Sequence, residues 1–163
     1  MKKNLFVLAA LATALTACGS NETRTVSEAA TATTAAPAKA CVPPPTELVV
    51  KDLAPGTGDA ARFRSAVLVE YTGWLYDGCA PDFKGAEFDS SVGKQPISLM
   101  VGVGRVIRGW DEGLIGLKEG GKRLLIIPPE KAYGAAGAPG GKIPPNSTLV
   151  FEGNLEKIIM QAQ

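Results

Sequence analysis

The chain contains no histidine among its 163 residues. This absence excludes Ser-His-Asp and Cys-His catalysis, and it removes the imidazole ligands that usually hold zinc or haem. The sequence also lacks a phosphate-binding loop and a G-x-S-x-G motif. Gly102 and Gly104 do not form a dinucleotide fingerprint, because the next glycine is Gly109 and no βαβ pattern surrounds them. We therefore expect any enzymatic activity to need neither a metal nor a cofactor.

Charge of one sign is not in excess either. The 17 basic and 16 acidic residues leave a formal net charge of +1, so electrostatics give no reason to expect a nucleic-acid partner. The length fits one domain with extensions. No feature of the sequence suggests more than a monomer.

Long hydrophobic runs are scarce, and the one at the N-terminus is short. Lys2 and Lys3 precede an apolar stretch from 5 to 15, which is too short to cross a bilayer core of about 30 Å. The stretch ends in Leu15-Thr16-Ala17-Cys18, which resembles the lipobox of bacterial lipoproteins. The resemblance implies a signal peptide at 1–17, diacylation of Cys18 and a membrane anchor. An ordinary secretory signal with an incidental cysteine is the alternative interpretation.

The segment that follows Cys18 predicts a lipidated, flexible tether over 18–45. It is rich in Ser, Thr, Ala and Pro and poor in large apolar side chains, and it ends in three consecutive prolines at 43–45. Residue 19 is glycine rather than the aspartate that implies inner-membrane retention in Gram-negative lipoproteins. We therefore expect a bacterial cell-envelope protein, placed in a Gram-negative cell at the outer membrane and facing the periplasm or the surface.

Cysteine is rare, with three residues in the chain. If Cys18 carries lipid, Cys41 and Cys79 remain, and an oxidising compartment favours a disulfide between them. Such a bridge would pin the end of the tether to the loop around Cys79. Two independent free thiols are the alternative, and two cysteines are too few for a zinc site.

Beyond the tether, alternating apolar and polar residues predict β-strands. The clearest case is 65–75, where Val67, Val69 and Tyr71 fall on one face. Further strands are expected at 47–53, from 88 onward, at 96–101, at 122–127 and at 148–159, with loops at 78–87 and 128–145.

One short helix is expected within 101–117. Apolar residues recur there at helical spacing, and Asp111 and Glu112 lie near the positive end of the expected helix dipole. The apolar face comprises Val106, Ile107, Trp110, Leu114 and Ile115. Because only a sheet is available to bury this face, we predict an α+β domain at 46–163, a twisted five- to six-stranded antiparallel sheet wrapped around one short helix.

Aromatic residues are few, but they suggest a pocket as well as a core. Taken singly, each is more often a packing residue. Tyr133, however, lies in the Gly- and Pro-rich stretch 132–140, where a core residue is not expected. Asp89 follows Phe88 directly, and a carboxylate beside an apolar helix face needs a partner.

Five blocks of sequence resemble the signatures of the FKBP family of peptidyl-prolyl cis/trans isomerases, in the family's order and from about 47 to 160. They are Tyr71-Thr72-Gly73, Glu87-Phe88-Asp89-Ser90-Ser91, Val106-Ile107-Arg108-Gly109-Trp110, Ala132-Tyr133-Gly134 and Ile143 to Phe151. The resemblance implies an active site between the sheet and the helix. Residues outside these limits, including the leader and Cys41, are not covered.

Carried over by position, the resemblance assigns roles to ten residues. Trp110 is implied as the floor under a proline ring, Tyr133 as a donor to a substrate carbonyl, and Asp89 as a carboxylate at the edge that favours the twisted amide. Tyr71 completes the catalytic group. The implied substrate-binding set is Phe88, Leu99, Val106, Ile107, Ile143 and Phe151. Ile97 and Leu99 are aliphatic where the family is usually aromatic, which puts sequence preference in question.

The activity implied is rotation of X-Pro bonds in exported proteins, with proline-containing polypeptides as substrates and macrolides such as FK506 and rapamycin as possible inhibitors. A non-catalytic proline-binding or chaperone module of the same fold is the alternative. The presence of Tyr71, Asp89, Trp110 and Tyr133 favours the enzyme, because a degenerate module would be expected to lose some of them.

Overall fold

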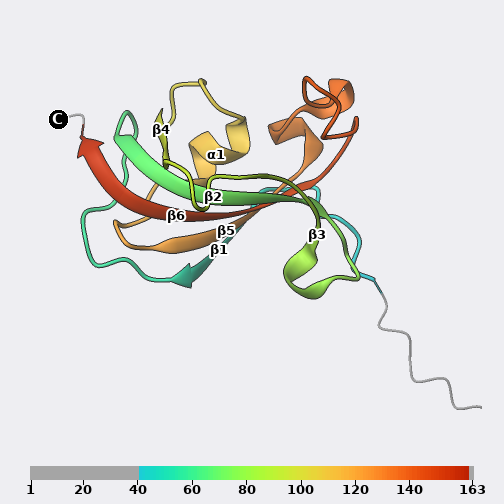
Figure 1. Ribbon diagram of the computed structural model, residues 1–163, viewed down its shortest axis with the longest axis horizontal. Helices are drawn as coiled ribbons and strands as arrows, with labels where there is room; N and C mark the ends of the chain where they lie inside the picture. Colours follow the sequence, from blue (N-terminus) through green and yellow to red (C-terminus); the bar gives the residue numbers. More distant parts are fainter. Residues whose placement is uncertain (1–40, 162–163) are drawn as a thin grey trace, which may run out of the picture. The chain divides into compact units, whose positions relative to one another are not determined.

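The structure is a computed structural model that describes residues 41–161. The predicted signal peptide, Cys18 and most of the predicted tether lie outside these residues. The described chain forms a six-stranded antiparallel sheet and one α-helix, as the sequence predicted (Figure 1). The strands are β1 (Val49–Ala54), β2 (Ala66–Tyr76), β3 (Lys84–Ser90), β4 (Ile97–Met100), β5 (Lys122–Ile127) and β6 (Leu149–Met160), and the helix is α1 (Arg108–Gly113).

The sheet is organised around its two long strands. Its order is β1-β5-β6-β2-β3, and β4 pairs with the first half of β2 on the same side as β3. In Figure 1, β2 and β6 curve together, and α1 lies on their concave side. Alternation explains this placement, because Val67 and Val69 of β2 and Leu155 of β6 belong to the same buried cluster, the main core, as Trp110 of α1.

The opposite face of the sheet carries a smaller apolar cluster. Leu124, Ile126 and Val150 are buried there, and Trp74, Tyr76 and Phe83 cover them. Both faces are covered at this point, and β5 accordingly carries four consecutive apolar residues, 124–127, and is buried from Arg123 onward.

The helix is shorter than the predicted segment 101–117. Residues 101–107 form a loop in which Gly102 and Gly104 have left-handed φ angles of 81° and 74°. Val106 and Ile107 therefore precede the helix, and Ile115 follows it with 45% of its surface exposed. Gly109 and Gly113 lie within α1 and contact β5: an added Cβ would come within 2.4 Å of Ile127 and 2.7 Å of Leu125. Glycines thus let the helix lie close to β5, while the apolar side chains of Trp110 and Leu114 are buried in the core.

The structure also corrects two predicted loop boundaries. β3 begins at Lys84, inside the segment 78–87 that was expected to be a loop, and a short 3₁₀ turn at Pro81–Phe83 precedes it. Pro128–Pro145, expected as an irregular loop, contains 3₁₀ turns at Pro129–Lys131 and Gly134–Ala136. No helix within 41–161 has the length and apolar character needed to cross a bilayer.

The last five residues of the predicted tether lie against the domain. Val42 donates its backbone N–H to the Gly78 carbonyl, and the Tyr76 hydroxyl donates to the carbonyls of Val42 and Pro43. A disulfide joins Cys41 to Cys79. Residues 41–45 therefore belong with the folded domain.

Candidate active site

A cavity of about 230 Å³ opens between the helix and the sheet. Eight of the ten predicted site residues line it, although they come from five separate parts of the sequence. The lining residues are Tyr71, Phe88, Asp89, Ile97, Arg105, Val106, Ile107, Trp110, Tyr133 and Phe151. Because these side chains are mostly apolar and aromatic, the cavity suits a compact hydrophobic ring.

Trp110 forms the inner end of the cavity and is only 5% exposed. Its ring packs edge-on against Tyr71, with centroids 5.1 Å apart, and against Phe151, at 5.3 Å. Phe88 makes a similar contact with Phe151 at 5.5 Å. Such T-shaped arrangements are favoured by aromatic quadrupoles, so each ring holds its neighbour in place. The indole Nε1–H is buried without a partner in the described chain.

Gly73 allows these rings to pack on the strand beneath them. A Cβ added at Gly73 would lie 2.7 Å from both Phe151 and Phe88. The wall of the cavity therefore depends on bare backbone in the middle of β2, which gives a physical reason for glycine in the Tyr71-Thr72-Gly73 block.

Among residues 41–161, Asp89 is the one carboxylate that lines the cavity. Its side chain accepts a hydrogen bond from the Tyr71 hydroxyl at 2.5 Å and another from the Ser90 backbone N–H at 3.0 Å. Tyr71 is the partner that the sequence argument required. Burial, followed by the hydrogen bond to Asp89 and its negative charge, raises the pKa of the Tyr71 hydroxyl well above its usual value. Tyr71 therefore keeps its proton near neutral pH and remains a donor.

Asp111 holds the loop that supplies one side of the cavity, a role that the sequence did not suggest. This buried carboxylate accepts hydrogen bonds from the backbone N–H groups of Gly102 at 2.8 Å and Gly104 at 2.6 Å. The prediction placed it at the helix start for its dipole. Its contacts show that it fixes the path of the chain into Val106 and Ile107.

Two predicted substrate-binding residues do not line the cavity. Leu99 is 8% exposed and Ile143 is 5% exposed, and both pack within the main core. Ile97 and Leu99 lie two residues apart and share one face of β4. Leu99 pairs with Val67 and is buried in the core, whereas Ile97, at the start of the strand, reaches the cavity. Arg105 also lines the cavity. The sequence did not predict this, because a charged residue in a loop is not expected in an apolar site.

The described residues offer no metal site, since no group of three or more Cys, Asp or Glu side chains within 41–161 is placed to hold an ion.

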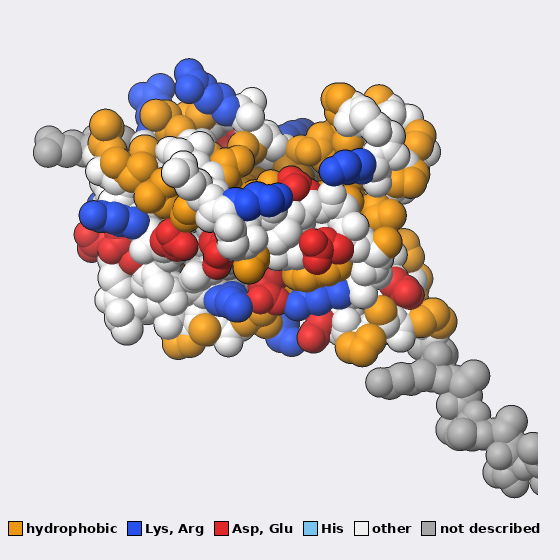
Figure 2. Space-filling view, in the orientation of Figure 1, with side chains coloured by type: hydrophobic (Ala, Val, Ile, Leu, Met, Phe, Trp, Pro, Cys, Tyr) orange, Lys and Arg blue, Asp and Glu red, His pale blue; other side chains and the backbone are white. Residues whose placement is uncertain are grey.

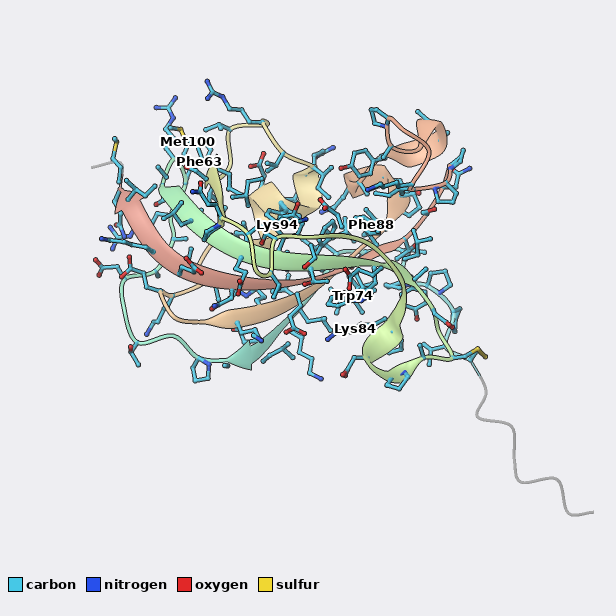
Figure 3. All side chains as sticks on the ribbon, in the orientation of Figure 1. Phe63, Trp74, Lys84, Phe88, Lys94 and Met100 are labelled. Atoms are coloured by element: carbon cyan, nitrogen blue, oxygen red, sulfur yellow. A yellow bond between two sulfur atoms is a disulfide. The ribbon has the colours of Figure 1, made fainter. Side chains whose placement is uncertain are left out.

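Figure 3 shows Phe88 extending from β3 toward the cavity side of the sheet, above Trp74 and Lys84. Lys84 lies 4.7 Å from the Trp74 ring centre, and Trp74 covers the smaller cluster on the other face. Trp110 and Trp74 thus pack on opposite faces of the sheet.

An antiparallel sheet wrapped on one short helix, with an aromatic cavity between them, defines an FKBP-like domain. The sequence model for "FKBP-type peptidyl-prolyl cis-trans isomerase" matches residues 58–156. The chain belongs to this family of enzymes.

Similar proteins agree with this assignment. An "FK506-binding protein" of Neisseria meningitidis serogroup A is 50% identical over 112 residues, covering 68% of this chain and 95% of that protein. The crystal structure of AtFKBP13 is 36% identical, with a TM-score of 0.59, and the match covers 71% of this chain and 95% of that one. A peptidyl-prolyl cis-trans isomerase from Pseudomonas syringae pv. tomato is 38% identical, with a TM-score of 0.56 and coverages of 68% and 74%.

Proposed function

We propose that the domain accelerates rotation about X-Pro bonds in exported polypeptides by binding the twisted amide in the aromatic cavity. Rotation about a peptide bond faces a barrier of about 18–20 kcal/mol because the C–N bond is partly double. The planar amide is more charge-separated than the twisted one, so an apolar, dewatered cavity disfavours the ground state relative to the transition state. No bond breaks, and a chain without histidine can do this. The observation that carries the proposal is the cluster of rings around Trp110.

The energy required is modest. A thousandfold acceleration corresponds to about 4 kcal/mol of differential binding. Burial of a proline ring against Trp110, with one or two hydrogen bonds that form best in the twisted state, is of this order.

Two donors are available for those hydrogen bonds. The Tyr133 hydroxyl lies at the cavity in a side chain that is 37% exposed. The Ile107 backbone N–H, just before α1, donates to no acceptor within 41–161. We assign both to substrate carbonyls, and we assign Asp89 to orienting Tyr71 and disfavouring the planar amide at the edge of the cavity.

The test is an isomerisation assay on a proline peptide with the full chain. Asp89→Ala and Trp110→Ala are expected to lower kcat/KM about tenfold or more, which corresponds to about 1.4 kcal/mol. Circular dichroism would verify that each variant is folded. Tyr71→Phe should lower activity, whereas Tyr76→Phe, the same change on the opposite face of the sheet, should not. Wild-type activity in all the cavity variants would reject this site, and a folded but inactive wild type would favour a binding module.

We further propose that the cavity binds macrolides of the FK506 type. The support is the apolar lining and the name of the Neisseria relative. The change in tryptophan fluorescence on titration with FK506 should saturate at one molecule per chain and should be smaller in Trp110→Phe, and isomerase activity should fall in parallel. An unchanged assay at saturating FK506 would contradict this.

We also propose that the chain is anchored in a bacterial envelope membrane through Cys18. The lipobox-like sequence supports this, and the Cys41–Cys79 disulfide is of the kind found outside the reducing cytosol. Each buried CH₂ contributes about 0.8 kcal/mol, so two acyl chains would anchor the protein firmly. Metabolic labelling with palmitate should mark the wild type and not Cys18→Ala. Equal labelling of both would exclude lipidation at this residue.

A further inference from the structure

One end of the sheet displays an aromatic ring between two arginines. Arg62, Phe63 and Arg64 form the turn before β2, and 56% of the Phe63 surface is exposed. The ring packs closely on Gly102, where an added Cβ would come within 2.5 Å of it. In Figure 3, Phe63 and Met100 both lie at the end of the sheet where β2 begins and β4 ends. A large apolar ring that is braced yet exposed is a feature of binding surfaces.

The turn is held rigidly in a strained form. Arg64 has a left-handed φ of 64°, which is uncommon for a residue with a side chain. The buried Ser65 accepts a hydrogen bond from the Arg62 backbone N–H at 2.9 Å and donates its own N–H to the Arg62 carbonyl at 3.0 Å. The Arg64 N–H bonds the Val101 carbonyl at 2.9 Å. The turn and the loop after β4 therefore form one surface.

This surface is basic although the whole chain is nearly neutral. Segments 60–66 and 100–107, which meet at this end of the sheet, contain three arginines and no acidic residue. Arg62, Arg64 and Arg105 form no ion pair within 41–161. Figure 2 shows basic side chains gathered over apolar ones at the upper left, while acidic side chains appear lower on the same face. We call Arg62, Phe63, Arg64, Met100 and Arg105 the arginine shelf.

The shelf is continuous with the cavity. Arg105 lines the cavity itself, and Ile97 lines it at the start of β4, whose other end meets the shelf at Met100. At about 3.3 Å per residue, β4 covers about 10 Å between these points. An extended polypeptide with its proline in the cavity would thus reach the shelf within about four residues.

We propose that the arginine shelf binds the chain that flanks the target proline and selects clients with acidic residues, together with an apolar one, in that flank. This inference rests on the proposed function. Unpaired arginines offer bidentate sites for carboxylates, and the exposed Phe63 ring offers an apolar contact between them. Since exposed charge pairs contribute little individually, the selectivity is moderate and depends on salt.

The test compares three peptides with the same X-Pro core: one with three glutamates before it, one with three glutamates after it, and one with glutamines in their place. At low salt, wild type should give a kcat/KM about three- to tenfold higher for at least one glutamate peptide than for the glutamine peptide. Arg64→Gln should lower this ratio, and Arg62→Gln/Arg64→Gln should bring it close to one. Lys51→Gln, which removes an exposed charge from β1, should leave the ratio unchanged. Equilibrium binding of the same peptides gives a second measure of the ratio.

The outcomes separate the two proposals. Turnover of the glutamine peptide tests the isomerase activity. The ratio of kcat/KM between the glutamate and glutamine peptides tests the shelf. If no peptide is turned over, the ratio of their binding affinities still tests the shelf. Equal values for all peptides in both measurements would overturn the shelf. A second result would also overturn the shelf: the double arginine variant keeps the wild-type peptide ratios but no longer binds vesicles of anionic phospholipid. That result would assign the arginines to a membrane surface.

Discussion

Asp111 shows how a residue outside the cavity determines its shape. Its two carboxylate oxygens hold the N–H groups of Gly102 and Gly104, and the loop between them leads into the cavity residues. An amide offers one acceptor oxygen in place of two. We expect Asp111→Asn to cost about 1–3 kcal/mol of unfolding free energy and to raise KM, because the loop loses one anchor.

Urea denaturation and peptide kinetics would check this. The control is Glu112→Gln, the same change at the next residue, whose side chain pairs at the surface with Arg108 and Lys131. Glu112→Gln should change both quantities little. If the two variants behave alike, Asp111 does not position the loop.

Glu152 gives stability a defined pH dependence. Partial burial raises the pKa of this carboxyl, but hydrogen bonds from Lys84 and Lys122 outweigh burial and set it below its usual value of 4.5. A lowered folded-state pKa stabilises the fold above the unfolded-state value, and this contribution is lost as the pH falls. The unfolding free energy of wild type should therefore exceed that of Glu152→Gln by about 1 kcal/mol at pH 7.

The difference between wild type and Glu152→Gln should shrink as the pH is lowered through about 4.5 and below. Urea denaturation at several pH values would measure it. A difference that stayed constant down to pH 3 would show that the two lysines do not stabilise the charged form.

At the scale of elements, the contact between α1 and β5 fixes the floor of the cavity. Gly109 and Gly113 let the helix lie directly on Ile127 and Leu125. We expect Gly109→Ala to destabilise the fold by about 1–3 kcal/mol through overpacking, although alanine favours helices. The control is Gly153→Ala on β6, where an added Cβ would sit 3.5 Å from Val69, an ordinary contact. Thermal unfolding would compare the stability of the two variants with that of wild type. If Gly109→Ala were as stable as Gly153→Ala, the close approach of α1 to β5 would be contradicted.

The elements also show what the sequence could and could not predict. Strand 122–127 was predicted with the bounds of β5, and the faces of β2 followed from alternation, because local patterning decides them. The helix was predicted too long, since the left-handed angles at Gly102 and Gly104 depend on Asp111, a contact that spacing does not reveal. The start of β3 was missed for a similar reason, because it follows a 3₁₀ turn whose Phe83 packs on the opposite face of the sheet.

The predicted site residues came from the family resemblance, and the structure places most but not all of them at the cavity. Resemblance brought together residues as distant as Tyr71 and Tyr133, which no local pattern could place in one cavity. It also offered Leu99 and Ile143, which are buried in the core, because the packing of β4 and of the 128–145 loop decides which side chains reach the cavity. Arg105 was missed because an exposed arginine in a loop has no distinguishing local pattern.

At the scale of the whole molecule, the disulfide ties the entry of the chain to the domain. Cys41 and Cys79 are 38 residues apart, and in the chain-entropy model a closed loop of this size contributes about 3–4 kcal/mol. We expect Cys41→Ser/Cys79→Ser to lower stability by up to that amount. Isomerase activity below the melting temperature should not change, because neither cysteine lines the cavity.

Thermal unfolding of the wild type with and without a reductant would check this, with the double serine variant as the control that a reductant cannot affect. A large loss of activity in a folded double variant would show that the disulfide shapes the cavity.

We propose that the cavity promotes rotation without moving a proton, and the isomerisation rate of a proline peptide in H₂O and in D₂O tests this proposal. Binding and desolvation alone predict a clear acceleration by wild type, with a rate ratio of about 1 between the two solvents and no change between about pH 6 and 9. A rate at least about twofold slower in D₂O, or a bell-shaped pH profile, would place a proton transfer in the transition state and contradict catalysis by binding and desolvation alone.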